Sequence, residues 1–270
     1  MGIMSGKKGI IFGVSNTNGI AYGIAKQLHE EGAEIAFTYA NEAMEKRVRP
    51  IAESMNAKMI VECDVTDENR LKEVFETYNN TYDGLDFVIH AVAFANREDL
   101  TGEFINTSKD GWNLALGVSA YSLIAISRNA RPYMKNGGSI FSLTYLGSER
   151  VVANYNIMGV AKATLEASTR YLADNLGKEG IRVNCISAGP VRTLAAKGIG
   201  GFDKMLKAAV LKAPLERNVT LEDIGKTGVY LASDLSSGVT GEVIHVDCGC
   251  HAVYASYREI DILSRGTVQE

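Results

Sequence analysis

Short apolar runs alternate with longer segments of helical periodicity along the whole chain, and this alternation constrains the fold more than any other feature. Nearly continuous apolar runs bounded by turn residues are typical of strands that are buried on both faces. The runs lie at residues 10–12, 34–39, 59–63, 85–90, 138–143, 182–187 and 242–246. The segments with helical spacing lie at residues 20–31, 41–56, 67–78, 112–131, 153–176 and 221–231. The pattern predicts an α/β fold with a seven-stranded parallel sheet.

The length and the uniform composition of the chain are typical of one domain. Its 270 residues contain no internal repeat, no low-complexity tract and no linker of the kind that separates domains. We therefore expect a single doubly wound, Rossmann-like domain over residues 1–270, with helices on both faces of the sheet.

Composition narrows the class of partner. The net charge of −4 argues against a general nucleic-acid binder, and no apolar run reaches membrane-spanning length. The segment before the first strand leaves no room for a signal peptide, so we expect a cytoplasmic protein. The cysteines are dispersed except for Cys248 and Cys250, and the histidines are scattered without ligand spacing, so we expect free thiols and no metal site.

A glycine-punctuated loop follows the first expected strand. Gly13 and Gly19 bracket this loop, and Ile20 begins the next helix. A strand, a glycine loop and a helix N-terminus together present backbone N–H groups to a phosphate. The glycines do not form a regular G-x-G-x-x-G motif, so taken alone the loop is equally consistent with a plain tight turn.

In a doubly wound sheet, ligands bind beyond the carboxyl ends of the strands. The loops after the first three strands would then face the adenosine half of a dinucleotide. Asp64 and Val65 would bind adenine through the carboxylate or the backbone, or Asp64 would serve only as a turn residue. The segment 39–41 (Tyr-Ala-Asn) offers neither an acid for ribose hydroxyls nor a cation for a 2′-phosphate. This absence favours NADH over NADPH, unless Lys46 or Arg47 folds back.

Tyr155 and Lys162 are seven positions apart. On a helix this spacing is about 700° of rotation and about 10.5 Å along the axis, so the two residues share one face. Tyr145 follows the fifth expected strand. Without other signals, the two tyrosines would be read as core aromatics and the lysine as a surface charge.

The segments 142–147, 154–162 and 187–195 favour a catalytic role for these residues over a structural one. They closely resemble the NADH-dependent enoyl-acyl-carrier-protein reductases of bacterial type II fatty-acid synthesis, a divergent branch of the short-chain dehydrogenase/reductase family. The likeness extends from Gly13 to Asp247. A Tyr-x6-Lys spacing with an upstream tyrosine is specific to that branch, whereas the ordinary family uses Tyr-x3-Lys with an upstream serine.

The resemblance implies an activity and a set of site residues. The activity is hydride transfer from NADH to the β-carbon of a trans-2-enoyl thioester, through an enolate. The catalytic residues would be Tyr145, Tyr155, which contacts the thioester carbonyl, and Lys162, which holds the nicotinamide ribose. Cofactor contacts would also come from Gly13, Gly19, Ile20, Asp64, Val65, Val92, Val191, Arg192, Thr193, Leu194 and Ala195. Ala95 would line the acyl site together with the two tyrosines.

Some positions depart from the family pattern. Ala93 stands where glycine is common and puts the pocket shape in question, and Ala40 weakens any claim about ribose contacts. The segment 248–250 (Cys-Gly-Cys) replaces the usual Gly-Gly-aromatic sequence.

The segment 191–213 is expected to form a substrate-binding loop and helix. Its glycine-rich part, 197–202, is a candidate lid, and the alternative is a solvated amphipathic helix that begins near Phe202. Lys197, Lys204 and Lys207 would attract an acidic acyl-carrier protein. By resemblance, the protein would be a homotetramer.

Two other functions remain open at this point. An ordinary ketoreductase or a sugar or steroid dehydrogenase is disfavoured because Gly159 occupies the position of the Tyr-x3-Lys lysine. A non-catalytic dinucleotide sensor would have no need of the tyrosines.

Overall fold

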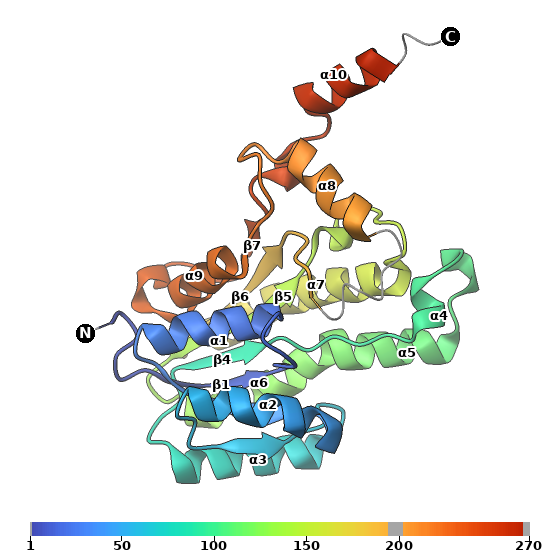
Figure 1. Cartoon of the computed structure of the whole chain (residues 1–270). Helices are drawn as coiled ribbons and strands as arrows, with labels where there is room; N and C mark the ends of the chain where they lie inside the picture. The colour runs from blue at the N-terminus through green and yellow to red at the C-terminus, as the bar shows by residue number, and fades with distance from the viewer. Residues whose placement is uncertain (1, 194–201, 267–270) are drawn as a thin grey trace.

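Residues 2–193 and 202–266 are described by the computed structural model, and within them seven strands form one parallel sheet (Figure 1). The strands are β1 (Lys8–Phe12), β2 (Glu34–Tyr39), β3 (Ile60–Glu62), β4 (Phe87–His90), β5 (Gly138–Thr144), β6 (Ile181–Ala188) and β7 (Val243–Val246). Their order is β3-β2-β1-β4-β5-β6-β7. Ile10 of β1 pairs with Ala36 on one side and with Val88 on the other, so the strand order reverses between β1 and β4. The predicted fold class and parallel sheet are confirmed.

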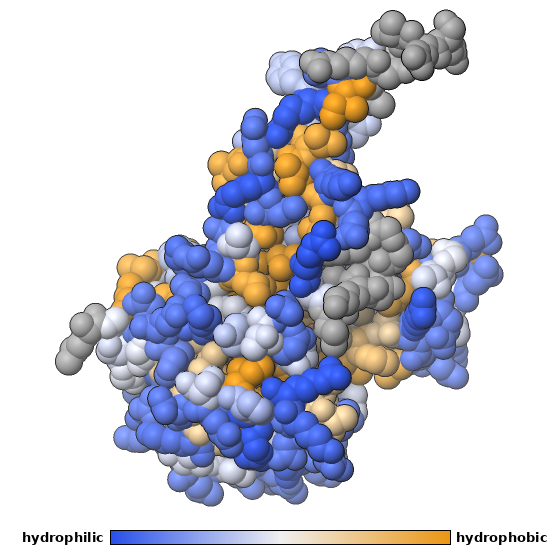
Figure 2. Space-filling model, in the orientation of Figure 1, coloured by the Kyte–Doolittle hydropathy of each residue, from blue (hydrophilic) through white to orange (hydrophobic). Residues whose placement is uncertain are grey.

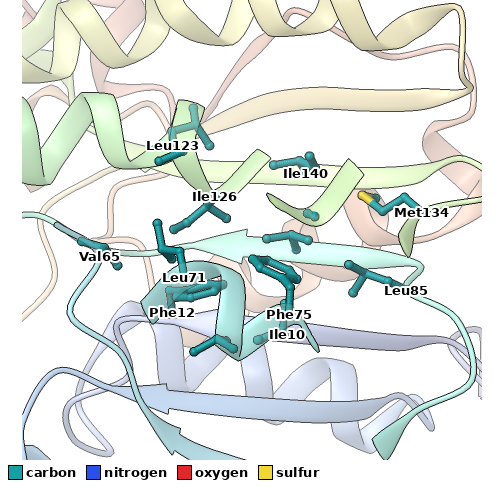
Figure 3. Packing of buried hydrophobic residues seen from close by; sticks show 14 of the residues in the cluster. Ile10, Phe12, Val65, Leu71, Phe75, Leu85, Leu123, Ile126, Met134 and Ile140 are labelled. Atoms are coloured by element: carbon teal, nitrogen blue, oxygen red, sulfur yellow. The ribbon is translucent and has the colours of Figure 1, made fainter. Parts of the chain in front are cut away.

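Helices cover both faces of the sheet because neighbouring strand residues point to opposite sides. Ile10 and Phe12 of β1 face α3 (Glu68–Thr81), α6 (Ser122–Ala130) and α7 (Asn156–Gly177), as the packing around Phe75, Leu71 and Ile126 in Figure 3 shows. Ile11 faces the other layer. That layer is formed by α1 (Ile20–Glu30), α2 (Glu42–Ser54) and α9 (Leu221–Ala232).

The long helix predicted over 112–131 is interrupted. The structure has α5 (Lys109–Leu116), then a π-helical turn (Gly117–Tyr121), then α6. The hydroxyl group of Ser119 in this turn accepts a hydrogen bond from the Phe94 backbone N–H at 3.0 Å and donates one to the Phe94 carbonyl at 3.2 Å. The bulge therefore ties the helix to the loop after β4. Apolar periodicity continues through the bulge, so the sequence pattern did not reveal it.

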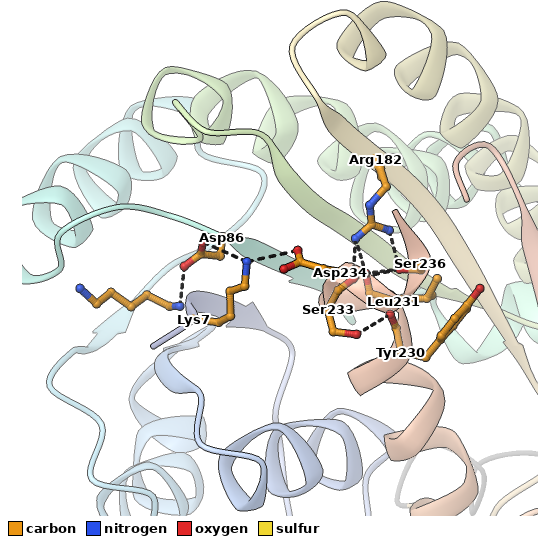
Figure 4. Close-up of polar contacts among 9 residues, drawn as sticks. Lys7, Asp86, Arg182, Tyr230, Leu231, Ser233, Asp234 and Ser236 are labelled. Carbon is orange, nitrogen blue, oxygen red and sulfur yellow. Dashed lines mark hydrogen bonds and ion pairs between the residues drawn. The ribbon is translucent and has the colours of Figure 1, made fainter. Parts of the chain in front are cut away.

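Polar contacts close the amino-terminal edge of the sheet, the edge at which the strands begin (Figure 4). The Lys7 ammonium lies 3.9 Å from the Asp86 carboxylate and 3.3 Å from that of Asp234. The Arg182 guanidinium donates to the Ser236 hydroxyl and to the carbonyls of Leu231 and Ser233. These contacts join the starts of β1, β4 and β6 to the end of α9 and leave the carboxyl edge open.

Two helices project beyond the body of the sheet, α8 (Phe202–Lys212) and α10 (Tyr257–Gly266) (Figure 1). Figure 2 shows hydrophobic side chains along this projecting part. Among the described residues, none of the helices combines the length and the apolar character needed to span a bilayer.

Candidate active site

A cavity of about 460 Å³ opens at the carboxyl edge of the sheet, where the strand order reverses. The loops after β1 and β4 form one wall, and the end of β5 with the start of α7 forms the other. Its lining includes the predicted residues Gly13, Gly19, Ile20, Val92, Ala95, Tyr145, Tyr155, Lys162 and Thr193. This is the position at which doubly wound sheets bind dinucleotides.

The glycine loop suits a phosphate group. Gly13 has φ +98°, and a Cβ there would lie 2.1 Å from the Ala91 carbonyl oxygen, so only glycine fits. Gly19 is the N-cap of α1, no side chain caps this helix, and its first turn holds no acidic residue. The first N–H groups of α1 and the positive end of its dipole therefore remain available to an anion. This loop fits the pyrophosphate of a dinucleotide.

Two tyrosines meet at the other wall. Tyr145 directly follows β5, and Tyr155 is the N-cap residue of α7. Their ring centroids are 5.1 Å apart and their planes are inclined by 73°, an edge-to-face contact. A Cβ at Gly147 would lie 2.5 Å from the Tyr155 ring, and a Cβ at Gly159 would lie 2.7 Å from the Gly147 carbonyl oxygen. The two glycines let the backbone approach the Tyr155 ring.

Lys162 of α7 lines the same cavity and is only 6% exposed. Its ammonium donates a 2.7 Å hydrogen bond to the carbonyl oxygen of Leu143 in β5. Burial lowers the pKa of Lys162 to about 8, and burial raises the pKa of Tyr155. At neutral pH the site therefore presents a neutral phenol and an ammonium group.

Tyr145 connects the site to α8. Its hydroxyl donates a hydrogen bond to the sulfur of Met205 at 3.4 Å, and burial raises the pKa of this phenol as well. A thioether is a weak acceptor, so a better acceptor on a substrate can replace it. Helix α8 thus contacts Tyr145 through a weak hydrogen bond to Met205 that a substrate can replace.

Not every predicted site residue lines the cavity. The Asp64 carboxylate accepts from the backbone N–H and the hydroxyl of Thr66, and Val65 is buried in the core beneath α3. Val191 packs against the core on the α1 face, and Arg192 forms a 2.8 Å ion pair with Asp203. Leu194, Ala195 and Lys197 lie outside the described residues, as does most of the candidate lid.

The cavity also contains residues that sequence reasoning missed. Met158 lies three positions after Tyr155 and four before Lys162, so helical periodicity alone places it on their face. Met205 lies in the segment 191–213, which we expect to bind substrate, but its own place in the cavity depends on how α8 packs. The other lining residues that the predicted site did not include are Ser15, Asn16, Ala21, Ala91, Ala93, Phe94, Leu100, Leu143, Thr144, Asn154, Ala188, Gly189 and Pro190.

His90 lies beneath the cavity and is fully buried. Its ring nitrogens lie 2.7 Å from the hydroxyl oxygens of Ser142 and Ser122, and burial lowers its pKa to about 3. A neutral, doubly hydrogen-bonded imidazole fits a structural role for this histidine.

Comparison with known proteins agrees with this geometry. The family model described as "Enoyl-(Acyl carrier protein) reductase" matches residues 13–251. The enoyl-acyl-carrier-protein reductase [NADH] FabI of Bacillus cereus is 52% identical over 253 residues, which cover 93% of this chain and 99% of the relative. The corresponding enzyme 1 of Rhizobium meliloti is 52% identical over 252 residues, 93% of each chain.

Solved structures show the same likeness. The Bacillus cereus reductase with NADP+ and indole naphthyridinone has a TM-score of 0.92 and 51% identity, over 94% of this chain and 100% of that one. The reductase of Anaplasma phagocytophilum in complex with NAD has a TM-score of 0.91 and 49% identity, over 94% and 97%. The chain belongs to the enoyl-acyl-carrier-protein reductase family.

Proposed function

We propose that this protein reduces the trans-2 double bond of enoyl thioesters carried on acyl-carrier protein, with NADH as the reductant, in the last reductive step of each fatty-acid elongation cycle. The observation that carries the proposal is the pair of tyrosines at the wall of the dinucleotide cavity, with Lys162 lining the same cavity. Family membership and the reductase activity named for the relatives support the same reaction.

The cofactor would be held at both ends of the cavity. The backbone of Gly13 and Gly19 and the N-terminus of α1 would hold the pyrophosphate, and Lys162 would donate hydrogen bonds to the nicotinamide ribose. When bound, NADH supplies the hydride that adds to the β-carbon of the substrate. Asp64 and Val65 are proposed to contact the adenine, and residues 191–195 the nicotinamide amide and phosphates.

Tyr155 would act on the thioester carbonyl. As negative charge develops on the carbonyl oxygen, the phenol donates a hydrogen bond to it and stabilises the enolate. A phenol whose pKa is raised by burial stays neutral and keeps its proton for this bond. Lys162 adds a positive field, and Tyr145 and Ala95 line the acyl site.

One assay separates this function from its alternatives. Purified protein is mixed with NADH and a crotonyl thioester, and loss of NADH absorbance is followed. We expect turnover with the enoyl thioester and none with a 3-ketoacyl thioester. Turnover of the ketoacyl substrate alone would indicate a ketoreductase, and NADH binding without turnover of either would indicate a sensor.

NADH is favoured over NADPH by the charges near the end of β2. The first turn of α2 carries Glu42 and Glu45, and these carboxylates pair with Lys46 and Arg49 respectively. Lys46 and Arg49 are engaged in these pairs, and the acids repel a 2′-phosphate. Of the two cations that could fold back, this leaves the exposed Arg47.

Lys204 and Lys207 on the exposed side of α8 are proposed to bind the acidic carrier protein, together with Lys197. In the part of the chain that the structure describes, Lys204 and Lys207 form no ion pair, whereas Lys212 of the same helix lies 3.8 Å from Glu259. Met205 of this helix lines the cavity, so a carrier bound to α8 would lie next to the acyl site.

The double variant Lys204→Glu/Lys207→Glu tests this docking surface. We expect a higher KM for carrier-bound substrate and an unchanged KM for a small crotonyl thioester. The control Lys72→Glu/Lys178→Glu makes the same charge change on exposed positions away from α8. Equal effects of both double variants would reject the docking surface.

We also propose that the protein is a cytoplasmic homotetramer. The projecting part exposes Tyr254 and Tyr257 almost fully, and Ile260 and Ile262 by about half. Apolar side chains of this kind favour association with another chain. Light scattering coupled to size-exclusion chromatography tests the tetramer, and a monomer at assay concentration would reject it.

A further inference from the structure

Glu166 is a buried carboxyl group beside the candidate active site that the proposed mechanism does not use. It lies on α7 one turn after Lys162 and is only 7% exposed. Its Oε1 atom accepts a 2.5 Å hydrogen bond from the Thr144 hydroxyl. Removing a carboxylate from water is costly unless it is hydrogen-bonded and paired with a positive charge.

The two side chains of α7 contact consecutive residues of β5. Lys162 donates to the Leu143 carbonyl, and Glu166 accepts from Thr144, directly before Tyr145. Residues four apart on a helix are neighbours, with Cβ atoms about 6 Å apart. The Thr144 hydroxyl fixes the carboxylate on the side of the helix that carries Lys162.

The other buried titratable groups that the structure describes around this pair are uncharged at neutral pH. Burial lowers the pKa of His90 on β4 to about 3 and raises the pKa of Cys185 on β6 to about 12. Burial also raises the pKa values of Tyr155 and Tyr145. Arg170, one further turn along α7, is exposed to solvent and screened by it. Within the described core, Glu166 is therefore the negative charge that acts on Lys162.

We propose that Glu166 is a positioning residue whose carboxylate, oriented by Thr144, holds Lys162 in its protonated, cofactor-binding form. This inference rests on the proposed role of Lys162 in binding the nicotinamide ribose. Burial disfavours the ammonium form of Lys162, and Cys185 and Glu166 both lie where a negative charge would oppose that effect. Because the Cys185 thiol stays protonated, the opposing charge at neutral pH is that of Glu166. The deprotonated amine would lose the charge that strengthens its hydrogen bonds.

The test is the pH dependence of NADH binding, followed by the fluorescence of bound NADH between pH 6.5 and 10. In the wild-type protein, affinity should fall as pH rises through about 8, where Lys162 loses its proton. Glu166→Gln keeps the size and the acceptor oxygen but removes the charge. We expect its midpoint to lie about one pH unit lower, so that binding is about threefold weaker at pH 7.5 and nearly unchanged at pH 6.5.

Two variants separate charge from structure. Glu166→Asp keeps the charge and should return the midpoint toward the wild-type value. Thr144→Val removes the hydrogen bond but keeps the carboxylate, so it should move the midpoint less than Glu166→Gln does. A purely structural role predicts weaker binding by the same factor at every pH.

A wild-type midpoint in Glu166→Gln would overturn the inference. If this variant does not fold, Glu166→Met/Thr144→Val replaces both partners with apolar groups and leaves no orphaned hydroxyl, and the same downward shift is expected. The proposed role of Lys162 fails separately. It fails if the wild-type protein shows no loss of NADH affinity at alkaline pH, or if the Lys162→Met variant still shows that loss.

Discussion

The rings of Tyr145 and Tyr155 meet edge to face, with their centroids 5.1 Å apart. Each ring thus fixes the direction of the other's hydroxyl, although the residues come from a strand end and a helix start. Tyr145 directs its hydroxyl to Met205, which leaves Tyr155 as the phenol proposed to act on the substrate carbonyl.

Tyr155→Phe keeps this ring contact and removes only the hydroxyl. We expect kcat with a crotonyl thioester to fall by about 10²–10³-fold, because one donor to the developing oxyanion is lost. The affinity for NADH should stay within twofold. Tyr145→Phe is the matched control and should reduce kcat less, so the reverse order would contradict the assignment.

Gly147→Ala tests the close approach of the backbone to Tyr155. The added Cβ would lie 2.5 Å from that ring, so we expect the ring to shift and kcat to fall while NADH still binds. Gly177→Ala, at the end of α7, meets nothing within 4 Å and should stabilise the protein by about 0.5–1 kcal/mol without changing kcat. Steady-state kinetics and thermal unfolding measure both. Unchanged kcat in Gly147→Ala would show that the ring position is not needed.

Lys162 should make the protein less stable at neutral pH. Its pKa is about 8 when folded against 10.5 for a free lysine, so the unfolded chain binds more protons between these values. Stability from this group therefore rises with pH across that window, and below pH 8 the penalty is at most about 3 kcal/mol. Lys162→Met also leaves the buried Glu166 carboxylate without its cation, at a cost that is the same across this pH range, so the test is the pH trend. Relative to wild type, the free energy of unfolding of Lys162→Met should fall by up to about 3 kcal/mol from pH 7 to pH 10.5, as the wild-type protein loses its penalty.

His90 should contribute to acid unfolding. Its pKa is lowered from 6.5 to about 3, so the neutral form is favoured in the folded protein. The stability it contributes is present above pH 6.5 and is lost as pH falls toward 3, by at most about 5 kcal/mol. In His90→Asn the free energy of unfolding should be lower than in wild type at pH 7. Between pH 6.5 and 4 it should fall less steeply with decreasing pH than in wild type. Parallel curves for the two proteins would contradict this.

Ala40→Arg tests the choice of cofactor. Ala40 lies between β2 and α2 and carries no capping role, whereas the Asn41 side chain accepts from the Met44 N–H. An added guanidinium should bind a 2′-phosphate, so the ratio of kcat/KM for NADPH to that for NADH should rise about tenfold. Ala40→Gln, with a side chain of similar length and no charge, should leave the ratio unchanged.

The sheet and its helices could be predicted from the sequence because they depend on local patterns, whereas the assignment of cavity residues depended on the family resemblance. Gly13 and Gly19 signal a loop, and the spacing of Tyr155 and Lys162 signals a shared face. The break between α5 and α6 could not be predicted, because it depends on the bond of Ser119 to the distant Phe94 backbone. Likewise, Met205 meets Tyr145 and Glu166 meets Thr144 only after the elements pack. The adenine contacts of Asp64 and Val65 remain predictions.

The polar contacts of Lys7, Asp86, Asp234 and Arg182 lie at the amino-terminal edge of the sheet, opposite the cavity at its carboxyl edge. A solid support attached near these residues would point the cavity toward the bulk solution. The enzyme could then be immobilised in one orientation, with its substrate entrance and α8 unobstructed.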